Sequence, residues 1–227
     1  MHYVMIKTSA RQIDKHCKAR FTQAERAALS DERMLESAIK LIVERGTEKT
    51  TLKEVGELAG YSRGLAGYRF GSKQGLFSFV VHAISEKWLK ELEKVTEGKF
   101  GLDAICSATD AHYHFCLDAP VHVRAFYILW FESISPGSKT REIITAIHQR
   151  RQRDVIEWIN LGVESNSIDT AVNVEAVAAQ FCSALVGIVY QWLVNPDSMD
   201  EIKELHNGLK CTMETVLKPV SIAELID

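Results

Sequence analysis

The sequence predicts an all-α protein, and three observations support this fold class. Each of its four prolines separates two stretches in which apolar residues recur at helical spacing. Capping boxes of the form S/T-x-x-E precede two of the apolar runs. No series of short alternating strands joined by Asn-Gly or Asp-Gly turns is found. The chain has 227 residues, 46% of them hydrophobic, which is enough to bury a full core in one or two domains.

The first part of the chain is expected to begin with three helices. Thr22 to Glu25 is a capping box, which predicts a short helix ahead of Ser30. Ser30 then caps a second start, and that helix ends at Gly46. A further box at Thr51 opens a helix that stops at Gly60. The apolar residues expected to be buried in these helices are Met34, Leu35, Ala38, Ile39, Leu41, Ile42, Val43, Leu52, Val55, Leu58 and Ala59.

Two more helices complete this part of the chain. Ser62 caps a short helix that runs to about Phe70, and Ser72 leads into a long helix from Lys73 to about Val95. Two short helices joined through a glycine turn and braced by an earlier helix form the helix-turn-helix pattern, whose second helix enters the major groove of DNA. The later apolar runs predict helices at about 102–118, 120–133, 139–164, 173–194 and 198–217.

Charge is distributed unevenly along the chain. Residues 1–95 carry 17 Lys+Arg and 12 Asp+Glu, whereas residues 96–227 carry 10 and 18, although the net charge of the whole chain is only −3. The two parts are therefore expected to have different partners. We divide the chain into a basic arm at 1–29, a helix-turn-helix domain at 30–78 whose linking helix continues to about 97, and a larger helical domain at 98–227. The arm is either a minor-groove contact or a solvated tail.

The sequence predicts neither a membrane span nor export. The longest nearly apolar run, Ala184 to Val194, has eleven residues, whereas about 20 are needed to cross a bilayer. The N-terminal residues contain no apolar stretch of signal-peptide length. Five scattered cysteines without CxxC spacing predict free thiols in a reducing compartment. We expect a cytoplasmic protein without membrane contact.

One segment carries a family resemblance. The residues from Thr50 to Phe77 read TTLKEVGELAGYSRGLAGYRFGSKQGLF. They resemble the DNA-binding domain of the TetR family of bacterial transcriptional regulators, and the match covers about 50 residues from Met34 to Ile84. The resemblance implies a homodimeric repressor that binds a palindromic operator in double-stranded DNA and is released by a small, largely apolar effector. It implies no enzymatic activity and no cofactor. The alternative is a helical protein-interaction or scaffold module without DNA binding.

The resemblance also implies which residues meet DNA. Lys73 would touch a phosphate at a helix N-terminus, and Tyr68 would contact the backbone. For Arg63, pairing with guanine and holding a phosphate remain equally open, while Leu65 offers apolar contact to a thymine methyl. Gly67 would permit close approach of DNA. The full set of predicted DNA-binding residues is Thr50, Thr51, Ser62, Arg63, Leu65, Gly67, Tyr68 and Lys73.

The second domain is expected to hold the effector and to form the dimer. By resemblance, the effector cavity lies among the helices from 102 to 194, and the aromatic residues expected to line it are Tyr113, Phe126, Trp130, Trp158 and Phe181. The last two helices are expected at the two-fold interface. Their predicted contact residues are Ala176, Ala178, Ala179, Ser183, Ala184 and Gly187, followed by the stripe Ile202, Leu205, Leu209, Met213 and Val216. Monomer core is the alternative for that stripe.

Three further motifs have a functional and a purely structural interpretation. Gly60 to Gly64 fits the G-x-S-x-G nucleophile elbow, but a capped helix precedes it where an elbow needs a strand. His112 and Cys116 are i,i+4 neighbours, but two ligands do not make a metal site, so no metal is predicted. The run His148 to Asp154, HQRRQRD, is either a site for an anionic ligand group or, as we prefer, a solvated helix face.

Overall fold

The computed structural model describes residues 22–218, and these residues form nine helices without a strand. The prediction of an all-α fold is therefore confirmed. From residue 52 onward, the ends of the predicted helices agree with the structure to within two residues. The helices are α1 (Gln23–Arg45), α2 (Leu52–Leu58), α3 (Arg63–Phe70), α4 (Lys73–Thr96), α5 (Gly101–Asp118), α6 (Pro120–Glu132), α7 (Arg141–Glu164), α8 (Val174–Val194) and α9 (Met199–Val216).

The start of α1 differs from the prediction. Thr22 and Glu25 form a complete capping box, in which the Thr22 hydroxyl accepts from the Glu25 amide at 3.2 Å and the Glu25 carboxylate accepts from the Thr22 amide at 2.7 Å. The helix then continues through Ser30, so the two expected helices are one of 23 residues. No glycine or proline interrupts this stretch, and a serine is tolerated inside a helix. The end of the predicted arm thus belongs to α1, and residues 1–21 of the arm lie outside the described residues.

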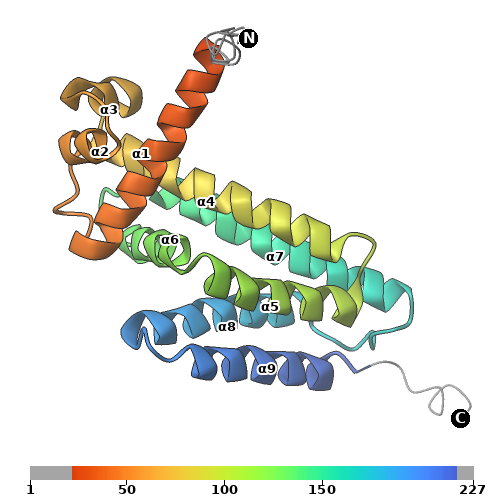
Figure 1. Ribbon diagram of the computed structural model, residues 1–227. Helices are drawn as coiled ribbons and strands as arrows, with labels where there is room; N and C mark the ends of the chain where they lie inside the picture. The colour runs from red at the N-terminus through yellow and green to blue at the C-terminus, as the bar shows by residue number, and fades with distance from the viewer. Residues whose placement is uncertain (1–21, 219–227) are drawn as a thin grey trace, which may run out of the picture.

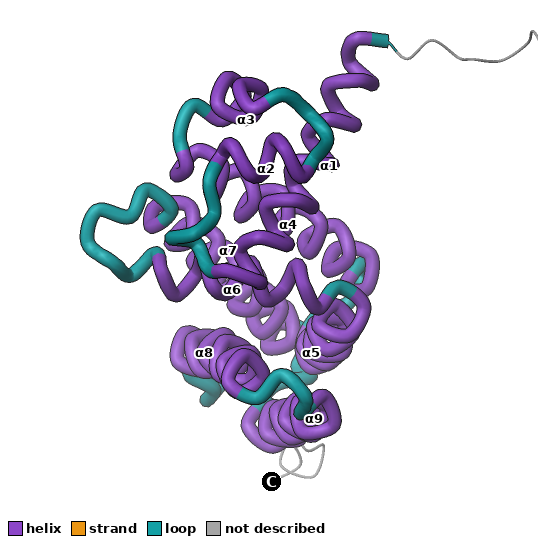
Figure 2. The backbone as a smooth tube through the Cα atoms, turned by 60° about the vertical axis from the view of Figure 1, so that its left-hand side comes forward, coloured by secondary structure: helices purple, strands orange, loops and turns teal. Residues whose placement is uncertain are grey.

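The helices form a small N-terminal unit and a larger bundle (Figure 1). Helices α1 and α3 pack against α4, and α2 packs against α1 and α3. The second half of α4 runs into the bundle beside α5 and α7. Helices α8 and α9 lie side by side at the end of the molecule opposite α3 (Figure 2). One continuous apolar core extends from Met34 and Val55 in the small unit to Phe181 in the bundle. The small unit and the bundle therefore share one core.

One of the expected core positions is wrong. Leu58, the last residue of α2, is 48% exposed. Val55 and Ala59 lie one helical turn apart and take the inward face, so Leu58 points away from the core.

Besides α4, helix α6 connects the two units. Near its start, the Nε2 atom of His122 lies 2.9 Å from a carboxylate oxygen of Glu36 in α1. At its end, Glu132 accepts a hydrogen bond of 2.5 Å from the Thr47 hydroxyl, just after α1. Both ends of α6 are thus fastened to α1 or to the turn that follows it.

Helix α8 as a whole is longer than the eleven-residue apolar run on which the membrane prediction rests. Among residues 22–218, it alone is long and apolar enough to cross a membrane by length and composition, with 21 residues and a mean hydropathy of 1.6. The apolar run from Ala184 to Val194 is its second half, and the predicted bounds of the whole helix, 173–194, agree with the structure. Core helices of folded domains pass the same test, and α8 packs along one side against α7 and α9.

The stripe predicted on α9 is mostly monomer core. Ile202, Leu209 and Met213 are buried against α5 and α8, whereas Leu205 and Val216 are about 40% exposed. On α8, Ala178 is also buried. The alternative interpretation is therefore the correct one for the buried residues, because α9 turns its most apolar face toward its own chain.

Candidate functional site

Helices α2 and α3 cross at close range. A Cβ atom on Gly56 would lie 3.2 Å from the Ser62 carbonyl oxygen and 3.6 Å from the Ala66 Cβ, so a small residue permits this approach. Gly60, with a φ of +80°, makes the turn between the two helices, in a conformation that other residues rarely adopt. The pair has the helix-turn-helix arrangement, with α3 at the outer edge of the small unit (Figure 1).

The inward face of α3 is packed. Ala66 is fully buried, and Leu65 and Phe70 are partly buried against the core. Leu65, for which a base contact is predicted, therefore helps to seat the helix. An ion pair holds the end of α3 to α1, since both oxygens of Asp31 accept from the Arg69 guanidinium, one of them at 2.8 Å from Nε.

The outward face of α3 presents one large aromatic ring. Tyr68 is 89% exposed. A Cβ atom added to Gly64 or to Gly67 would meet no atom within 4 Å, so the backbone at both positions is open to a close approach. Ser62 is exposed and makes no capping hydrogen bond. The side chain of Arg63 lies outside the described part of the structure.

The N-terminus of α4 lies near the loop that leads to α2. The Ser72 hydroxyl caps α4 by accepting from the Gly75 amide at 3.0 Å. Lys73 reaches back and donates to the Glu48 carbonyl at 2.8 Å, which leaves its other two N–H donors available. The lysine charge and the helix dipole together make this corner favourable for an anion.

The two predicted threonines differ in their surroundings. The Thr51 hydroxyl is the N-cap of α2 and accepts from the Glu54 amide at 3.2 Å. Thr51 itself is exposed. Thr50 is fully buried, and its hydroxyl donates to the Gly46 carbonyl at 2.9 Å. Thr50 therefore stabilises the turn before α2.

A small, partly open cavity lies within the bundle. Its volume is about 40 Å³, enough for only a few water molecules. Of the aromatic residues expected at the cavity, Trp158 and Phe181 line it, whereas Tyr113, Phe126 and Trp130 do not. The lining residues from α4, α5, α7 and α8 are Trp88, Leu92, Ala108, His112, Arg151, Asp154, Val155, Trp158, Phe181, Cys182 and Leu185.

Two histidines in the bundle have fixed tautomers. His206 Nδ1 lies 2.7 Å from the Ile202 carbonyl oxygen, which can only accept, so this nitrogen carries the hydrogen. His206 Nε2 then accepts from His112 Nδ1 at 2.9 Å. Burial lowers the pKa of both imidazoles and keeps them neutral. Because Nδ1 of His112 is occupied, the ring supports the fold here, and no group of three potential metal ligands occurs among residues 22–218.

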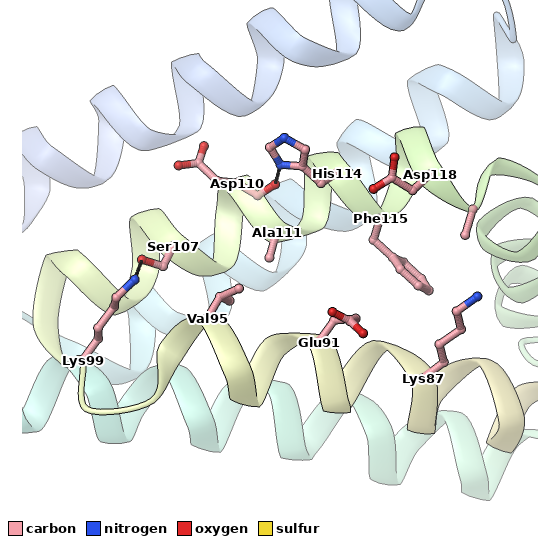
Figure 3. A pocket seen from close by; sticks show the side chains of 11 residues that line it. Lys87, Glu91, Val95, Lys99, Ser107, Asp110, Ala111, His114, Phe115 and Asp118 are labelled. Atoms are coloured by element: carbon pink, nitrogen blue, oxygen red, sulfur yellow. Dashed lines mark hydrogen bonds between the residues drawn. The ribbon is translucent and has the colours of Figure 1, made fainter.

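A separate, open groove lies between α4 and α5 and is lined by charged and apolar side chains (Figure 3). Charged side chains from the two helices face each other across it, including Lys87 and Glu91 from α4 and Asp118 from α5. At one end, Lys99 donates to the Ser107 hydroxyl at 2.8 Å. The groove therefore holds charges of both signs.

Comparisons with known proteins agree with this geometry. Residues 34–79 match the family model described as bacterial regulatory proteins, tetR family. The chain is 24% identical to a probable HTH-type transcriptional regulator, ArpR, of Pseudomonas putida, over 78% of this chain and 86% of the relative. It is 24% identical to the HTH-type transcriptional regulator AcrR of Shigella flexneri, over 88% and 94%.

Solved structures show the same fold. A complex of SmeT with triclosan is 17% identical and has a TM-score of 0.69, covering 85% of this chain and 96% of that one. The transcriptional regulator FadR from Bacillus subtilis, in complex with stearoyl-CoA, is 14% identical with a TM-score of 0.69, over 84% and 99%. The family match and the curated relatives confirm the predicted resemblance and the expectation of a regulator in place of an enzyme. Residues 34–79 are therefore a DNA-binding domain of the tetR family type, and the whole chain is similar to HTH-type transcriptional regulators.

Proposed function

We propose that this regulator is a cytoplasmic, homodimeric repressor that binds a palindromic operator and is released by a small, largely apolar effector. The outward face of α3 is the main evidence for a DNA-binding surface. Tyr68 on this face is 89% exposed, whereas the other large apolar side chains of the helix pack inward. We assign DNA contact to Thr51, Ser62, Gly67, Tyr68 and Lys73, and to Arg63 from its place at the start of α3. Thr50 and Leu65 support this surface from within.

The dimer interface is assigned to the faces of α8 and α9 that the monomer leaves uncovered. On α8 these positions are Ala176, Ser183, Gly187 and Tyr190, which recur at helical spacing along one exposed side. Around Gly187, no atom lies within 4 Å of a Cβ position, so the monomer itself gives no reason for a small residue there. Close approach of a second copy would explain the small residue at this position. A two-fold dimer also fits a palindromic operator.

Helix α4 couples the effector cavity to the DNA surface. Trp88 and Leu92 in its second half line the cavity, and its first residue is Lys73. An effector that enlarges the cavity must shift these side chains away from α7 and α8, which moves α3 relative to its counterpart in the second copy. A coupling free energy of about 1–3 kcal/mol is typical of such linkage. The small-molecule complexes of SmeT and FadR support an effector of this kind.

Substitution of Lys73 tests the phosphate contact. We expect Lys73→Ala to weaken binding to operator and random DNA alike, because a phosphate carries no sequence information. The slope of log K against log salt concentration should fall by about 1 per subunit in fluorescence anisotropy titrations. Lys94→Ala, at the opposite end of α4, is the matched control and should leave the slope unchanged. An unchanged slope in Lys73→Ala would remove this lysine from the interface.

A further inference from the structure

Arg151 on α7 places a positive charge inside the bundle. Its guanidinium carbon lies 5.1 Å from the centre of the Trp130 ring and 5.5 Å from that of Phe126, and one of its nitrogens is 3.3 Å from the Tyr127 hydroxyl. Phe126 and Tyr127 are almost completely buried. The three aromatic residues all belong to α6, so this helix fixes the position of the charged group.

No ion pair within the described part of the chain holds the Arg151 guanidinium, although Asp154, one helical turn further along α7, lines the same cavity. Among the ion pairs of residues 22–218, none involves Arg151, although the adjacent Arg150 pairs with Glu93 at 3.5 Å and with Asp154 at 3.9 Å. Burial raises the pKa of the Tyr127 hydroxyl and raises the pKa of the Cys182 thiol to about 11, so both groups stay uncharged. The neighbouring His112 is also neutral, because burial lowers its pKa, so it does not balance the charge of Arg151. Removing an unpaired cation from water costs desolvation free energy. An anion bound beside the cation offsets part of this cost.

Arg151 lies at the border of two spaces in the bundle. It lines the small cavity and also an outer groove of about 520 Å³ between α4 and α7. Trp88, Leu92 and Asp154 are the other residues shared by the two spaces. Movement of the Trp88 and Leu92 side chains would join them, and the enlarged space would have apolar walls from Trp158 and Phe181. The charged group would then stand beside a largely apolar chamber.

From this arrangement we infer that the effector is an amphipathic carboxylate, whose acid group pairs with Arg151 and whose apolar body lies against Trp88, Trp158 and Phe181. This inference rests on the proposed function, in which the cavity is the effector site. An arginine fork matches a carboxylate in a bidentate arrangement. The run HQRRQRD therefore has two roles: Arg150 belongs to the solvated face that the sequence favoured, and Arg151 belongs to the anion site.

The test compares ligands that differ only in the head group. Decanoate, 1-decanol and decylammonium are titrated into the full chain. Binding is followed by calorimetry and by intrinsic tryptophan fluorescence, to which Trp88 and Trp158 at the cavity contribute. We expect decanoate to bind about 10- to 100-fold more tightly than 1-decanol, and decylammonium most weakly. Arg151→Gln should reduce the preference for decanoate over 1-decanol to less than about 3-fold while leaving the affinity for 1-decanol similar. Arg150→Gln is the matched control and should keep the preference.

Each outcome decides the inference. Equal affinity of the acid and the alcohol for the unaltered protein, or a preference for the acid that survives in Arg151→Gln, would overturn it, as would the absence of binding by all three compounds. Circular dichroism verifies that the variants are folded, and Arg151→Lys, which keeps the charge, should retain part of the preference. Release of DNA is measured separately. Binding of decanoate through Arg151 without any loss of DNA affinity would support the ligand class and contradict effector-released repression.

Discussion

Replacing Gly75 with alanine is expected to destabilise the protein and to misplace its recognition helix. Gly75 lies in the first turn of α4, and a Cβ atom there would lie 2.2 Å from the carbonyl oxygen of Phe70, the last residue of α3. Because this oxygen belongs to the backbone, α3 must move relative to α4. Overpacking of this kind costs about 1–3 kcal/mol, which exceeds the gain of about 1 kcal/mol in helix propensity. Thermal unfolding should show a lower Tm, and operator affinity should fall with it.

Gly67→Ala is the matched control for the stability measurement. Gly67 lies in the middle of α3, and its Cβ position has no neighbour within 4 Å. The same chemical change should therefore raise the free energy of unfolding by about 0.5–1 kcal/mol through helix propensity. If Gly75→Ala were as stable as the unaltered protein, the close contact between α3 and α4 would not exist in solution.

The change Gly187→Glu is expected to separate the dimer. In the monomer this position is exposed and has open space around it, so the glutamate should not disturb the fold. At a two-fold interface the same carboxylate is buried twice without a partner, at a cost of about 3–5 kcal/mol. Sedimentation at micromolar concentration should show a folded monomer with nearly unchanged helicity. Binding to a palindromic operator should weaken by at least about 100-fold, because the two half-sites are no longer engaged together.

An exposed position away from α8 provides the comparison for this variant. Asn160→Glu on α7 adds the same charge to the helical surface and should leave the dimer intact. A Gly187→Glu protein that sediments as a dimer would move the interface away from this face of α8.

Local signals explain which features the sequence predicts well. The ends of α2, α3 and α4 follow from capping residues such as Thr51 and Ser72 and from the glycine turns, and the structure places them as expected. Where two capping signals lie close together, the prediction of the helix start fails. Ser30 resembles a cap, but the complete box at Thr22 starts the helix earlier, so the serine is an interior residue of α1.

The cavity is harder to predict because its wall is set by tertiary packing. Apolar spacing shows that Trp88 and Leu92 are buried, but not that they face a cavity. Phe126 and Trp130 are aromatic residues of the bundle and so are predicted to line it, yet both turn toward Arg151. The orientation of this arginine depends on α6, which is distant from it in sequence. Only the packing of α6 against α7 shows that Arg151, unlike its neighbour Arg150, points toward the bundle interior.

The most direct test of the account is selection of binding sites from a pool of random double-stranded DNA by the full-length protein. We expect the enriched sequences to be two-fold symmetric, with half-site centres about one helical turn or a multiple of it apart, because two copies of α3 enter successive major grooves. Tyr68→Ala should enrich the same sequences less strongly, and one dimer should bind each site. Enrichment of sequences without two-fold symmetry, or no enrichment over the starting pool, would contradict a dimeric regulator that reads DNA through α3.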